Sequence, residues 1–66
     1  MEITVNGKLL QTATDATVAQ LIQQLTLGNE RIAVEHNARI LEPDEWHDVS
    51  LAEGDTLEIV RFVGGG

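Results

Sequence analysis

The sequence predicts an α+β fold in which one helix packs across a mixed sheet of four or five strands. Two observations lead to this class. Stretches of alternating apolar and polar residues flank one segment of helical periodicity, and turn-forming residues separate the stretches. The chain has 66 residues, enough for a single domain. It contains no cysteine, so the fold must depend on an apolar core instead of disulfides.

The first predicted element is a β-hairpin. Ile3 and Val5 alternate with polar neighbours, which is typical of a half-buried strand. Asn6 and Gly7 follow, and this pair is a strong hairpin signal because both turn positions favour positive φ. Residues 8–12 then return as the second strand.

A single helix is predicted over residues 17–27. Thr17 can cap its N-terminus, and Gln20 stands three residues later, where a capping box places Glu or Gln. One apolar stripe follows at helical spacing, formed by Val18, Leu21, Ile22 and Leu25. Gly28 provides the stop, because glycine readily adopts the left-handed conformation that ends helices.

The rest of the chain predicts three strands and a short helical turn. The strands span residues 31–36, 39–41 and 56–63, and the turn spans residues 43–47. The crossover through the helix is expected to run the third strand parallel to an earlier one. This order of elements is that of the β-grasp fold. We assign residues 1–63 to the β-grasp domain and residues 64–66 to a flexible C-terminal glycine tail.

The charge balance excludes some classes of partner. Eleven acidic residues and four basic ones give a formal net charge of −7. Nucleic acids and anionic membranes require a basic surface, so neither is expected to bind. No apolar run approaches the roughly 20 residues of a membrane span, and we expect a cytoplasmic protein.

Residue types that often carry chemistry lack a supporting pattern here. His36 and His47 fall in separate elements without the spacing of a metal site, so we expect both at the surface. The acidic residues around Trp46 indicate a solvated face, and Trp46 is expected to cover the core, with contact to a partner as the alternative. The domain is therefore expected to hold no metal, no bound cofactor and no active site of its own.

The last strand carries more information. Leu57 and Ile59 share one face, which we assign to the core. The opposite face carries Glu58, Val60 and Phe62. Exposed apolar side chains beside a functional end suggest a docking surface, to which Arg61 could add contact with an acidic partner. The alternative is that loops cover Val60 and Phe62.

Gly64, Gly65 and Gly66 follow this strand directly. Three extended residues reach about 10 Å, so a terminal carboxylate on Gly66 could enter a narrow pocket of another protein. Glycine also permits close approaches that a Cβ would block. The alternative is a frayed terminus or a linker scar without a function.

The residues described above resemble those of the ThiS family, the sulfur carrier proteins of thiamine biosynthesis in the ubiquitin-like β-grasp superfamily. The resemblance covers essentially the whole chain, and its most specific mark is the closing segment at residues 54–66. Its earlier marks are the hairpin at 5–8, the helix start at 17–22, the strand at 32–37 and the segment at 40–46 with Pro43 and Trp46.

The resemblance implies a protein cosubstrate and not an enzyme. A ThiF-like adenylyltransferase would use ATP and magnesium to adenylate the carboxylate of Gly66. A persulfide sulfur donor would then displace AMP to leave a thiocarboxylate, which a ThiG-like thiazole synthase would consume. Gly64 and Gly65, with Val60, Arg61 and Phe62, would contact these partners.

Three alternatives stay open. Molybdopterin-synthase small subunits use the same chemistry, but they usually carry prolines shortly before the final glycines and a somewhat longer chain, and neither feature is present. A ubiquitin-like modifier shares the terminal glycines and would form an isopeptide with a lysine. A structural β-grasp module would have an inert tail.

Many relatives end in two glycines and this chain in three, so we take Gly66 as reactive and Gly64 as a spacer.

Overall fold

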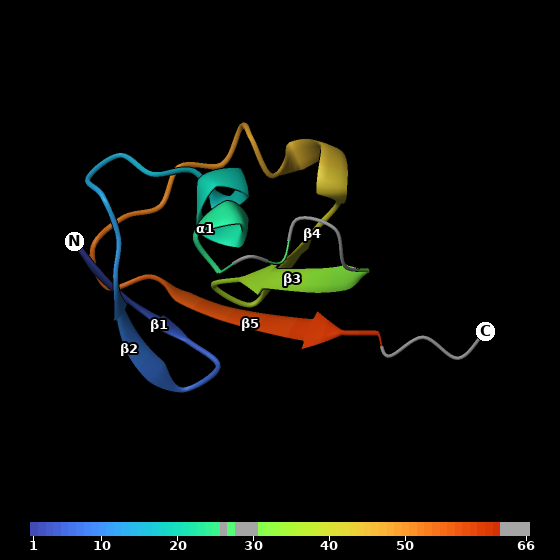
Figure 1. Cartoon of the computed structure of the whole chain (residues 1–66), viewed down its shortest axis with the longest axis horizontal. Coiled ribbons are helices and arrows are strands. Elements are labelled where there is room, and N and C mark those ends of the chain that lie inside the picture. The colour runs from blue at the N-terminus through green and yellow to red at the C-terminus, as the bar shows by residue number, and fades with distance from the viewer. Residues whose placement is uncertain (26, 28–30, 63–66) are drawn as a thin grey trace.

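Two hairpins and a strand between them build the sheet, and one helix lies across a face of it (Figure 1). The structure is a computed structural model that describes residues 1–25, 27 and 31–62. Within them the elements are β1 (Glu2–Val5), β2 (Lys8–Gln11), α1 (Val18–Gln24), β3 (Ile32–His36), β4 (Arg39–Leu41), the 3-10 turn η1 (Pro43–Glu45) and β5 (Thr56–Arg61). The predicted α+β class with a mixed sheet is confirmed.

The strand order is β2-β1-β5-β3-β4, which places β5 in the middle of the sheet. β5 pairs with β1 in parallel and with β3 in antiparallel orientation, and the two hairpins are antiparallel. It follows that β3 runs parallel to β2, as expected of the crossover through α1, although β1 and β5 separate them. β5 alone joins the two hairpins among the described strand pairs.

Both hairpins close through turns of positive φ. Asn6 and Gly7 have φ of 51° and 80°, which confirms the turn predicted from this pair. Asn37 and Ala38 have φ of 47° and 72° at the turn between β3 and β4. Because Ala38 has a Cβ, this second turn holds a residue in a conformation that L-amino acids rarely adopt.

The start of α1 is the predicted capping box. The backbone N–H of Gln20 donates to Thr17 Oγ1 over 3.1 Å, and the backbone N–H of Thr17 donates to Gln20 Oε1 over 2.8 Å. The helix ends at Gln24, earlier than predicted, because the N–H of Leu27 donates to the carbonyl of Ile22, five residues back, over 3.0 Å. Gly28, the predicted stop, lies outside the described residues.

The core lies between α1 and the sheet. Its buried apolar side chains are Ile3, Ala16, Val18, Leu21, Ile22, Ile32, Val34, Leu41, Leu51, Leu57 and Ile59. Trp46, at the end of η1, is partly buried against this cluster, as predicted for a residue that covers the core. In Figure 1, α1 and η1 lie on one side of the sheet, and no described helix covers the other side.

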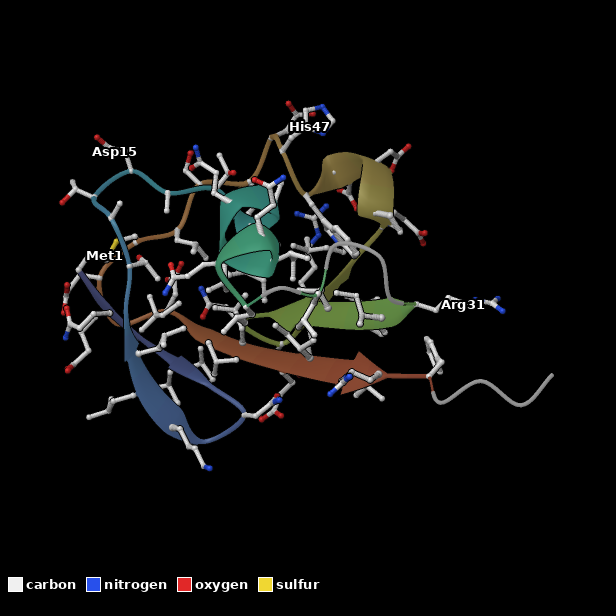
Figure 2. The ribbon with its side chains drawn as sticks, viewed as in Figure 1. Met1, Asp15, Arg31 and His47 are labelled. Carbon is white, nitrogen blue, oxygen red and sulfur yellow. The ribbon has the colours of Figure 1, made fainter. Side chains whose placement is uncertain are left out.

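His36 is partly buried, which corrects the expectation of a surface histidine. Its side chain is 16% exposed, and its Nε2 lies 2.7 Å from Asp55 Oδ2. The reason is strand alternation: His36 shares a face with Ile32 and Val34, both buried, and pairs in register with Leu57. His47 is at the surface, with a side chain that is 69% exposed (labelled in Figure 2).

Candidate docking surface and family

The side chains of β5 alternate as the sequence predicts. Leu57 and Ile59 are buried in the core, whereas Val60 is 56% and Phe62 is 59% exposed. Val60 therefore lies on the face of the sheet that carries no described helix, which we call the open face. Phe62 lies one residue beyond the end of β5, so strand alternation does not assign it to either face. No described loop covers them, so the predicted exposure is confirmed.

Phe62 is the last described residue before the glycine segment. Its N–H donates to the carbonyl of Arg31 over 2.9 Å, which fixes it beside the start of β3. Arg61 is exposed and pairs in register with Ile32, so alternation places it on the other side of the strand from Val60. Gly64, Gly65 and Gly66 lie outside the described residues, and their role stays a prediction.

The structure adds Ile40 to the open face. Its side chain is 70% exposed on the edge strand β4. A shallow depression of about 140 Å³ joins it to Val60 and is lined by Ala33, Val34, Glu35, Ile40, Glu58 and Val60. The sequence did not single out Ile40 because a three-residue strand does not reveal which of its neighbours faces the core. Once Leu41 is known to be buried, strand alternation places Ile40 on the opposite face.

A second depression lies at the end of the molecule where β5 finishes. It has a volume of about 390 Å³ and is lined by Arg31, Ile32, Pro43, Trp46 and Phe62. The indole Nε1 of Trp46 is buried and has no hydrogen-bond partner in the part of the chain that the structure describes. Arg31 points away from the sheet at this end (labelled in Figure 2). Contact of Trp46 with a partner stays a prediction.

Two features are absent from the described residues. Within residues 1–25, 27 and 31–62, no group of three or more His, Cys, Asp or Glu side chains could hold a metal ion. In the same residues, no helix is long and apolar enough to cross a membrane.

The comparison with protein families decides the relationship of this chain. The model of the ThiS family matches residues 2–66. The chain belongs to the ThiS family. This is the sulfur carrier family of thiamine biosynthesis. The match to the family model includes Gly64, Gly65 and Gly66.

ThiS proteins from two bacteria are similar over nearly their full length. The sulfur carrier protein ThiS of Bacillus subtilis is 39% identical over 62 residues, which cover 92% of this chain and 94% of that protein. The sulfur carrier protein ThiS of Escherichia coli is 27% identical over all of both chains. A crystal structure of the ThiS protein from Geobacter metallireducens matches all of both chains with a TM-score of 0.84 and 32% identity. The ubiquitin-like β-grasp fold is thereby confirmed.

A longer protein is also similar. The thiazole synthase of Paramagnetospirillum magneticum is 35% identical over 66 residues, which are all of this chain but 20% of that protein. The chain thus spans about a fifth of the length of this relative. This protein, which is named a thiazole synthase, therefore contains a segment similar to the whole of this chain.

Proposed function

We propose that this chain carries sulfur as a thiocarboxylate on Gly66 and donates it to thiazole formation. The observation that carries the proposal is the position of the glycine run. Two residues separate it from the end of β5, it is close in the sequence to the exposed side chains of Val60 and Phe62, and the ThiS family match includes it. The β-grasp domain would then be the part that a partner binds, and the tail would be the part that reacts.

The first step would be activation of the carboxylate. A free carboxylate is a poor electrophile because it lacks a leaving group. A ThiF-like adenylyltransferase would bind ATP and magnesium, and a Gly66 carboxylate oxygen would attack the α-phosphorus. The bond to the β-phosphate breaks, pyrophosphate leaves, and an acyl-adenylate forms. Gly64 and Gly65 suit this step because a tail without side chains can enter a narrow active site.

The second step would introduce the sulfur. The terminal sulfur of a persulfide attacks the acyl carbon, and AMP leaves with the electron pair of the broken C–O bond. The resulting acyl disulfide is cleaved by a thiol reductant, which leaves the thiocarboxylate. The thiazole synthases of Paramagnetospirillum magneticum and Magnetococcus marinus, 35% and 33% identical to this chain over 66 residues, favour thiazole synthase as the acceptor.

Intact mass spectrometry tests the proposal. The protein is incubated with the adenylyltransferase, ATP, magnesium and a persulfide donor. We expect a mass increase equal to the exchange of one oxygen for one sulfur. A ladder of higher-mass conjugates would instead indicate a modifier, and an unchanged mass would indicate an inert module.

The proposal also requires a free carboxylate on Gly66 in the natural protein. Mass spectrometry of the C-terminal peptide, from protein isolated from its source, measures this directly. We expect a peptide that ends at Gly66. A peptide that continues past Gly66 would contradict the carrier mechanism, because an amide carbonyl cannot be adenylated in this way.

A further inference from the structure

Two glutamates lie directly opposite each other in the sheet. Glu35 on β3 and Glu58 on β5 are partners in the antiparallel register. Glu35 also pairs with Ile40 on β4, so one row runs from Ile40 through Glu35 to Glu58. Strand alternation places this row on the open face, since the neighbouring positions Val34 and Ile59 are buried. Two like charges therefore face the same side at the closest cross-strand positions.

No described residue compensates these two charges. The ion pairs within residues 1–25, 27 and 31–62 join His36 to Asp55, Arg39 to Glu45 and His47 to Asp48. None of them includes Glu35 or Glu58, and the same-face positions Ala33 and Val60 beside them are apolar. Like charges directly opposite in a sheet are destabilising, so this arrangement reduces the stability of a domain with a small core.

The pair is framed by exposed apolar side chains. Ile40 is 70% and Val60 is 56% exposed, and both line the depression of about 140 Å³ that Glu35 and Glu58 also line. A protein surface that covered this patch would remove water from the two carboxylates. Their repulsion would then grow unless the surface supplied a cation. The patch therefore fits a basic side chain surrounded by apolar groups.

We propose that the adenylating enzyme places one arginine or lysine between Glu35 and Glu58, with apolar side chains against Ile40 and Val60. The cation turns the repulsion between the carboxylates into two charge-assisted hydrogen bonds. This inference rests on the proposed function, because it takes the adenylating enzyme as the partner. It adds the residues that recognise the enzyme, which are separate from the glycine tail that reacts.

Binding and stability of the same variants test the inference. We measure the Kd for the adenylating enzyme by calorimetry without ATP, and the Tm of the free chain. Glu58→Gln and Glu35→Gln are each expected to weaken binding by about tenfold or more. The same changes are expected to raise the Tm by about 2–4 °C, because they remove the repulsion. Glu58→Lys should raise the Tm further and weaken binding most.

Asp48→Asn is the matched control. It removes one negative charge from a side chain that is 76% exposed, next to His47 on the helix side of the molecule (Figure 2). We expect wild-type affinity and Tm. If Glu58→Gln binds as tightly as Asp48→Asn, the inference is wrong. It is also wrong if magnesium or calcium alone raises the Tm of the wild type but not of Glu58→Gln, since the pair would then be a cation site.

The inference and the proposed function fail in different ways. ATP–pyrophosphate exchange with the wild-type chain tests the function. If exchange occurs and its KM for the chain is unchanged in Glu58→Gln, the inference alone fails. If the wild-type chain binds but supports no exchange, the carrier function fails, and the affinities still decide the role of the glutamate pair.

Discussion

His36 Nε2 lies 2.7 Å from Asp55 Oδ2, although 19 residues separate them in the chain. An ionised carboxylate only accepts hydrogen bonds, so Nε2 carries the proton of this contact. Asp55 also accepts from the backbone N–H of Ala52 over 2.8 Å and from Asn37 Nδ2 over 3.1 Å. Asn37 Oδ1 in turn accepts from the N–H of Thr56 over 2.9 Å. One carboxylate thus ties the β3–β4 turn to the start of β5.

The Asp55 contacts predict a loss of stability in acid. Burial raises the pKa of Asp55, but the hydrogen bonds from His36, Asn37 and Ala52 outweigh it and hold the pKa below its ordinary value. The ionised form is therefore favoured by folding. Its contribution is complete above the ordinary pKa of Asp, about 4, and is lost as the pH falls through the lower pKa of the folded state.

Urea unfolding of the wild type and of Asp55→Asn, at a series of pH values from about 2 to about 7, measures this loss of stability. The series spans the ordinary pKa of Asp, about 4. We expect a loss of about 1–3 kcal/mol at neutral pH and a flatter acid limb than in the wild type. Asp15→Asn is the control, since Asp15 is exposed and asparagine tolerates its φ of 66°. An equal acid dependence in Asp55→Asn and the wild type would contradict the prediction.

Opposite substitutions in the two hairpin turns are predicted to have opposite effects on stability. Gly7 has a φ of 80°, and a Cβ there would meet no atom within 4 Å, so Gly7→Ala adds backbone strain alone. We expect a loss of about 1–2 kcal/mol. Ala38 has a φ of 72°, and Ala38→Gly should gain about 0.5–1 kcal/mol. Chemical denaturation of both variants checks the pair, and the same sign for both changes would refute this explanation.

The exposure of Phe62 predicts a defect in activation without a defect in folding. Phe62→Asp should raise the KM of the chain in ATP–pyrophosphate exchange by about tenfold, because an apolar contact of the docking surface is lost. The Tm should stay near that of the wild type, since Phe62 is 59% exposed. Leu9→Asp is the control: Leu9 is 69% exposed on β2, with β1 between it and β5. Equal KM values for the two variants would exclude this contact.

Removal of Gly66 separates the reaction from the fold. Among the described residues, the buried apolar side chains of the core lie between Ile3 and Ile59, so the shortened chain should unfold at the same urea concentration as the wild type. ATP–pyrophosphate exchange should be lost, because the carboxylate would no longer reach the α-phosphorus. Continued exchange by the shortened chain would show that the reactive carboxylate is not the one on Gly66.

Local patterns predicted the elements of this fold well. The Asn6-Gly7 turn, the Thr17 capping box and the alternation of Leu57 and Ile59 are each decided by residues a few positions apart, and the structure confirms them. The positions of His36 and Ile40 could not be predicted from local patterns. Their surroundings depend on which strands pair and in which register, and those pairings join residues far apart in the chain.

The same limit applies to the docking surface. Val60 and Phe62 were predicted because the long alternating strand assigns both faces. The opposition of Glu35 and Glu58 could not be predicted, because a shift of one residue in the β3–β5 register would place different side chains opposite each other.

The middle position of β5 has a consequence for synthesis. Translation delivers β1, β2, α1, β3 and β4 before Thr56 emerges, and none of the described strand pairs joins the two hairpins until β5 enters between β1 and β3. In a polypeptide arrested before this point, β1 and β3 each lack the neighbour that β5 provides, and Leu57 and Ile59 are missing. Such a fragment is expected to be a substrate for proteases. Only a nearly complete polypeptide would present the open face, so an adenylating enzyme that reads this face would select finished molecules over interrupted ones.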